Sequence, residues 1–255
     1  ESYTKIEIES EMPMSLSVSA IAQWRITSSS HVILWMILCL PLLAGCTPSN
    51  TSARDTDDFD AIEAAKTITR NEDKVTSLVQ EVVDTVDLED EESLRKGLER
   101  YKEAVALLDE SVRLARSSTG PRLQRFTLRN RIANGYTVLY AMADEKCTPL
   151  EEEGLRPSEE LLRNRAESKL EAEKWLKLAR RDMETHLANT PIQYQSPEQY
   201  WELHKIYVQL ADFRSARETL IRMKDNFGNR IGNNDRREID SRIRYFAQKV
   251  LDEGN

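Results

Sequence analysis

The sequence has few of the residue types from which catalytic and metal sites are usually built. Its 255 residues include only eight glycines, three histidines and three cysteines. It contains no Gly-rich phosphate loop, no H-E-x-x-H metal motif and no G-x-S-x-G nucleophile motif. The carboxylates of Glu151, Glu152 and Glu153 are more typical of a solvated loop than of an acid/base pair. We therefore predict that the chain is not an enzyme and that it binds no metal and no cofactor.

An excess of positive charge is also absent. The chain carries 36 Lys and Arg residues against 44 Asp and Glu residues, which gives a net charge of −8. A surface that binds nucleic acid needs clustered positive charge to neutralise the phosphate backbone. The composition therefore argues against nucleic acid as a partner.

The sequence has only one long hydrophobic run, the 15 residues from His31 to Gly45. A membrane-spanning helix needs roughly 20 apolar residues. This run is shorter, contains Pro41 and ends in small residues, which is typical of the hydrophobic region of a signal peptide. Two other interpretations stay open, a short buried helix and an uncleaved membrane anchor.

The run ends in Leu43-Ala44-Gly45-Cys46, which resembles the lipobox of bacterial lipoproteins. The resemblance implies that residues 1–45 are an upstream extension and a signal peptide, and that Cys46 becomes an acylated N-terminus. Residues 46–56 are small and polar after the cysteine, and we expect a flexible tether there. In a diderm bacterium, Thr47 after the lipidated cysteine implies a lipid anchor in the outer membrane that faces the periplasm.

Residues 57–255 show the periodicity of α-helices and no sustained alternation of the kind that marks strands. We predict an all-α domain of about seven helices. The expected elements are one helix from about residue 57, a second that carries Leu94 to Ala115, then about 122–143, 158–188, 197–210 and 213–227, and a last helix with Asp235 as its N-cap.

Two details of this assignment depend on local signals. Residues 144–156 contain Pro and Gly and are expected to form an inserted loop. That loop would hold Cys147, which has no intramolecular disulfide partner, because Cys39 lies in the signal peptide and Cys46 carries lipid. In the helix that follows, the predicted buried stripe is Leu162, Ala166, Leu170, Leu176, Ala179, Met183 and Leu187.

The segment 197–227 resembles a tetratricopeptide repeat. Tyr200-x2-Leu203-His204-x2-Tyr207 is followed by Ala216-x3-Leu220. It departs from that family because His204 replaces a small residue and no Pro closes the repeat. The resemblance implies an array of about three helical hairpins with a C-terminal capping helix. An irregular helical bundle is the alternative.

The same resemblance implies where partners bind, because tetratricopeptide proteins hold ligands on the first helix of each hairpin. The corresponding positions are Trp201, Lys205 and Gln209 in one helix and Asn130 and Asn134 in another. Amide and ammonium groups can hold a peptide backbone or a carboxylate, and Trp provides a large contact area. The alternative for Trp201 is packing against the capping helix.

From these features we expect a membrane-anchored periplasmic lipoprotein that acts as a protein–protein interaction scaffold in an envelope complex. Its partners would be envelope proteins or peptides in the helical groove. A lipoprotein that binds a small molecule or glycan in a pocket between helices is the alternative. A lipoprotein enzyme would require a pocket that brings His186 and His204 together with a carboxylate.

Overall fold

The computed structural model of the protein describes residues 55–115 and 119–253. Within these residues all regular structure is helical, with seven α-helices, one short 3₁₀ helix and no strand. The predicted all-α class is confirmed. The predicted signal peptide and Cys46 lie outside the described residues, as does the expected tether up to residue 54. No described helix combines the length and hydropathy that crossing a membrane requires.

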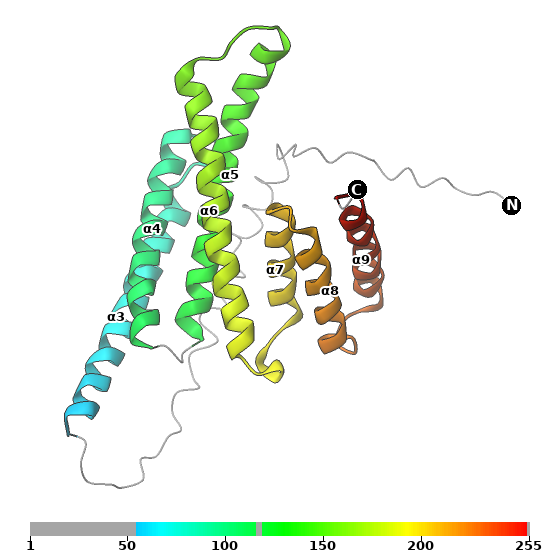
Figure 1. Ribbon diagram of the computed structural model, residues 1–255. Helices are drawn as coiled ribbons and strands as arrows, with labels where there is room; N and C mark the ends of the chain where they lie inside the picture. The colour runs from blue at the N-terminus through cyan, green and yellow to red at the C-terminus, as the bar shows by residue number, and fades with distance from the viewer. Residues whose placement is uncertain (1–54, 116–118, 254–255) are drawn as a thin grey trace, which may run out of the picture.

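The helices form an open series in which the extensive contacts join helices that are consecutive in the sequence (Figure 1). Four long helices, α3 to α6, stand side by side, and the shorter α7 to α9 continue the series beside α6. The elements are α3 (Asp55–Thr85), α4 (Glu91–Leu114), α5 (Gly120–Glu152), α6 (Glu159–Asn189), the 3₁₀ helix η1 (Ile192–Tyr194), α7 (Pro197–Gln209), α8 (Phe213–Phe227) and α9 (Asn233–Glu253).

Polar side chains define several of the helix starts. The carboxylates of Asp90 and Asp212 accept backbone N–H groups in the first turns of α4 and α8. These bonds satisfy donors that have no partner inside the helix. The predicted capping box at Ser196 is present at the start of α7. The predicted N-cap Asp235 instead lies in the first turn of α9, because that helix begins at Asn233.

The loop predicted at residues 144–156 is wrong, because α5 continues to residue 152 and only a short turn separates it from α6. Cys147 therefore lies in a helix, where its side chain is fully buried. Arg165 of α6 donates hydrogen bonds to Asp144 and Glu151 of α5. Contacts with α6 thus keep this end of α5 helical although it contains Pro149.

The buried stripe predicted for α6 is also partly wrong. Leu170 is 67 % exposed and Ala166 is exposed. The buried face carries Ser168, Ala172 and Ala179 in addition to larger side chains. Small side chains let two helices approach closely, and α5 is the helix with which α6 makes its most extensive contact.

Three hydrophobic clusters follow one another along the series. Buried side chains of α3, α4 and α5 form the first, α5 to α8 the second, and α7 to α9 the third. Gly135 of α5 permits a close approach in the first cluster, because an added Cβ would lie 2.5 Å from Leu98 Cδ2 of α4. The core is therefore a chain of local contacts rather than one central core.

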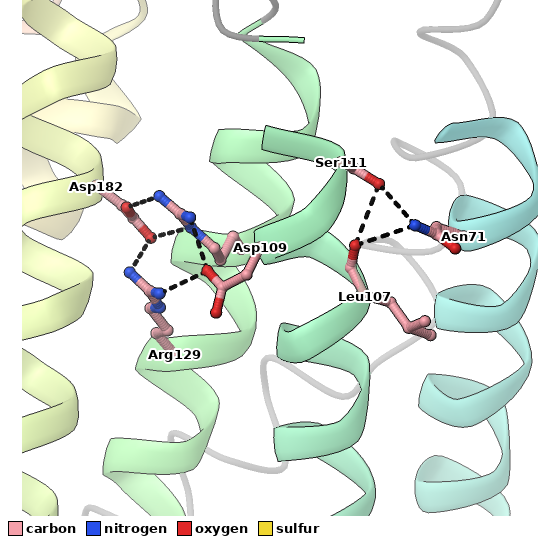
Figure 2. A network of polar contacts seen from close by, with 7 residues as sticks. Asn71, Leu107, Asp109, Ser111, Arg129 and Asp182 are labelled. Carbon is pink, nitrogen blue, oxygen red and sulfur yellow. Dashed lines mark hydrogen bonds and ion pairs between the residues drawn. The ribbon is translucent and has the colours of Figure 1, made fainter. Parts of the chain in front are cut away.

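A cluster of buried charges joins α4, α5 and α6 (Figure 2). Asp182 of α6 accepts hydrogen bonds from Arg125, at 2.5 and 3.0 Å, and from Arg129, at 2.9 Å. The same two arginines of α5 donate to Asp109 of α4 at 2.7 and 2.9 Å. Burial lowers the pKa of Arg129, but a guanidinium stays charged in proteins. Each buried charge is thus compensated by opposite charges from neighbouring helices.

A second buried polar contact joins α3 to α4 (Figure 2). The Asn71 amide of α3 donates to the Leu107 carbonyl oxygen at 3.3 Å and to Glu110 at 3.0 Å. It also donates to Ser111 Oγ at 3.4 Å. Asn71 and Ser111 are both buried, so leaving the amide without these partners would be unfavourable. The contact fixes how far α3 extends along α4.

The charge cluster predicts a large difference between two similar substitutions. Asp182→Asn should lower the free energy of unfolding by about 3–5 kcal/mol, because it leaves only the half-exposed Asp109 to compensate two guanidinium groups that are mostly buried. Asp109→Asn is the matched control and should lower it by less than about 1 kcal/mol, because that side chain is 48 % exposed. Chemical denaturation followed by circular dichroism measures both. Equal losses in the two variants would contradict this account.

Candidate functional site

The three residues predicted for α7 lie in different environments. Trp201 is half-buried and packs against the third hydrophobic cluster, as Leu187 and Ile243 also do. The guanidinium of Arg242, from α9, lies 5.0 Å from the centre of its ring. One turn on, Lys205 is half-buried and forms an ion pair with Glu202.

The third of these residues, Gln209, ends α7 and is exposed. Because Arg242 lies over its ring, the indole of Trp201 belongs to the contact between α7 and α9. The polar ends of Lys205 and Gln209 reach solvent further along the helix. The partner-binding role of all three residues stays a prediction.

The two asparagines predicted for α5 lie one turn apart and are both half-buried. Asn130 Oδ1 is buried and has no hydrogen-bond partner among the described residues. Such an acceptor is unfavourable unless another group satisfies it. Within the described residues, no hydrogen bond, ion pair or ring contact joins Asn130 or Asn134 to the predicted residues of α7. A partner that used both sets would have to span two helices.

His204 lies where α7, α8 and α9 meet, and its side chain is fully buried. Its Nδ1–H donates to the Ala216 carbonyl oxygen of α8 at 3.1 Å. The rings of Trp201 and Phe246 lie 5.4 and 5.3 Å away, between ring centres. Burial is the main reason that the pKa of His204 is lowered to about 4, and the nearby charges of Arg242 and Lys205 lower it further. His204 is therefore neutral at physiological pH.

His186 has a separate environment at the end of α6. Gln199 Nε2 donates to His186 Nε2 at 3.0 Å, and burial lowers the pKa of this imidazole as well. In the described part of the chain, no hydrogen bond, ion pair or ring contact joins His186 to His204. The described residues also contain no group of three His, Cys, Asp or Glu side chains that could hold a metal ion.

The connection between α6 and α7 is held by a polar network that the sequence did not indicate. The Gln195 amide donates to the carbonyl oxygens of Leu187 and Thr190 and accepts a hydrogen bond from Tyr200. The turn that it supports leaves Ile192 and Tyr194 largely exposed. A loop with a fixed backbone and exposed apolar side chains is suited to contact another molecule.

Two surface hollows of about 460 and 470 Å³ lie away from the predicted residues. The first lies between α3 and α4 above Val82, Val86 and Gly97, and the second lies on the outer face of α6 around Leu170 and Leu178. The sequence pattern did not indicate the second hollow, because its periodicity placed Leu170 in the buried stripe of the helix. No protein-family model, curated protein or solved structure matches the chain.

The buried, neutral state of His204 predicts a dependence of stability on pH. A histidine with a pKa near 6.5 in the unfolded chain and about 4 in the folded chain favours the folded state fully above pH 6.5. That contribution is lost as the pH falls from 6.5 towards 4. At pH 5 the free energy of unfolding should be lower by roughly 2 kcal/mol than at pH 7.5 because of this group.

Comparison with His204→Asn isolates the effect, because an Asn amide can still donate to the Ala216 carbonyl oxygen and does not titrate. Urea denaturation at both pH values measures the difference. The variant should lose roughly 2 kcal/mol less than the wild type between pH 7.5 and pH 5. An equal loss in both proteins would show that other groups are responsible.

Proposed function

We propose that the protein is a periplasmic lipoprotein, anchored to the outer membrane through acylated Cys46, whose helices form a scaffold for other envelope proteins. The observation that carries this proposal is the open helical series, in which extensive contacts join consecutive helices (Figure 1). An open series keeps a large exposed surface for its size, which is how helical repeat proteins bind their partners.

A tetratricopeptide-like arrangement of hairpins is the finer form of this proposal. The pairs α3–α4, α5–α6 and α7–α8 would be the hairpins, with α9 as the capping helix. The α7–α8 pair supports it best, because Tyr200, Leu203, Tyr207, Ala216 and Leu220 are all buried at the positions that this repeat uses for packing. In the longer pairs, support is limited to the antiparallel contacts between consecutive helices.

The partner would be a protein segment or peptide that uses exposed side chains on the first helix of a hairpin. Lys205 and Gln209 can bind a carboxylate or a peptide backbone. Binding of a small molecule or glycan is the alternative. It is less well supported, because charged side chains of Glu81, Arg100 and neighbouring residues line the hollow between α3 and α4.

The lipid anchor predicts the behaviour of one substitution. Cys46→Ala should release the protein from the membrane fraction, because it removes the thiol that carries the acyl chains, and two chains are enough for stable anchoring. Cys147→Ala makes the same change at a buried position and should leave the distribution unchanged. Cell fractionation with immunodetection measures both. Retention of Cys46→Ala in the membrane fraction would contradict the lipoprotein assignment.

The binding role of α7 is best tested at Lys205 and Gln209, whose polar ends reach solvent, because Trp201 also contacts α9. The double variant Lys205→Ala/Gln209→Ala should lose at least one protein that the wild type captures from solubilised membranes. Lys96→Ala/Gln80→Ala removes the same side-chain types from exposed positions elsewhere and serves as the control. Quantitative mass spectrometry compares the captured proteins. Identical sets from all three proteins would remove these residues from the proposed site.

A further inference from the structure

The first turns of α3 extend beyond the helix on which the rest of α3 packs. Asn71 lies opposite Ser111, and α4 ends only three residues after Ser111, at Leu114 (Figure 2). The two helices are antiparallel, so α3 residues before about 68 have no neighbouring turn of α4 (Figure 1). We call residues 55–67 the α3 overhang. At 1.5 Å per residue it is about 20 Å long.

The α3 overhang is acidic and exposes apolar side chains. Its sequence contains five Asp and Glu residues and one Lys. No residue between 60 and 70 is buried, and Ile62 is 53 % exposed. Ala61 and Ala65 are exposed beside it. A helix surface with this composition suits an apolar hollow that has positive charge at its edge.

The outer face of α6 provides such a hollow. It is a shallow hollow of about 470 Å³ that is open to solvent, and all its lining residues belong to α6: Leu170, Glu173, Lys174, Lys177, Leu178 and Arg181. Leu170 is exposed although it is a large apolar side chain. Lys174 and Lys177 pair with Glu171 and Glu173 of the same helix, and Arg181 adds a third cation. The face therefore keeps a net positive charge, which is opposite to that of the α3 overhang. From Leu170 to Arg181 the helix rises about 17 Å, close to the length of the overhang.

We propose that the α3 overhang of one copy of the chain docks on the α6 hollow of a second copy. The two surfaces match in charge and length, and each exposes a large aliphatic side chain. The overhang cannot reach the hollow of its own chain, because α3 is one continuous helix held against α4 at Asn71. Each copy would present an overhang at one contact and a hollow at the next.

Such a contact is heterologous, because it joins two different surfaces of the same chain. Heterologous contacts build rings or open chains rather than closed dimers. The proposal therefore predicts head-to-tail assembly beyond the dimer. It does not depend on lipidation of Cys46, because both docking surfaces lie in the described helices.

Cross-linking of the full-length protein in detergent tests this directly. Mixing Ile62→Cys with Leu170→Cys and adding a short thiol-to-thiol cross-linker should give a dimer and no larger product. The double variant Ile62→Cys/Leu170→Cys should give a ladder of larger species, because each copy then has both reactive surfaces. Each single variant alone should give no product above the background of the wild type, whose described cysteine is buried.

Two controls separate docking from random collision. Leu155 is 54 % exposed, close to the 53 % of Ile62, and it lies outside the α6 hollow. The Leu155→Cys variant should therefore not cross-link to the Ile62→Cys variant. Adding Lys177→Glu to Leu170→Cys should reduce the dimer yield severalfold, and high salt should do the same, because both weaken charge attraction at the edge of the hollow.

The proposal is overturned if the mixed variants give no dimer above background, or if Leu155→Cys reacts as well as Leu170→Cys. A dimer above background from either single variant alone would also overturn it, because that result requires like surfaces to meet. Sedimentation of the wild-type chain that shows only monomers at all tested concentrations has the same consequence.

Discussion

The buried carboxylate of Asp182 is the contact on which the arrangement of the long helices depends. Removing a charge from water is strongly unfavourable unless opposite charges and hydrogen bonds replace the solvent. Only one relative position of α5 and α6 brings both Arg125 and Arg129 to this carboxylate. Because the same arginines bind Asp109, α4 is held at the same level. Hydrophobic stripes alone would tolerate sliding by a turn, whereas this cluster does not.

A fixed alignment of helices of unequal length leaves some ends without neighbours. Asn71 sets the position of α3 against α4. The first turns of α3 therefore extend beyond the C-terminal end of α4. The exposed apolar side chains of Ile62 on α3 and Leu170 on α6 lie outside the three hydrophobic clusters. The polar contacts that stabilise the series thus also determine which surfaces remain available for other molecules.

Sequence reasoning succeeded where local signals carry the information. Apolar periodicity predicted the helices, and the capping box formed by Ser196 and Gln199 correctly predicted the start of α7. It failed where contacts between residues that are distant in the sequence determine the structure. Pro149 indicated a loop, but α6 keeps that segment helical, and Ser168 and Ala172 are buried because they are small. The Asp182 cluster combines residues more than fifty positions apart, and no spacing in the sequence announces it.

The candidate site shows the same division. The repeat pattern identified the positions on α7 and left open whether Trp201 packs against the last helix. In the structure, the guanidinium of Arg242 of α9 lies over the Trp201 ring. The departure at His204 explains why. An imidazole is larger than the small residue of the repeat, and it is accommodated because it donates to the Ala216 carbonyl oxygen and lies against Phe246. This packing joins α9 to Trp201 and His204 of α7, whereas the polar ends of Lys205 and Gln209 reach solvent.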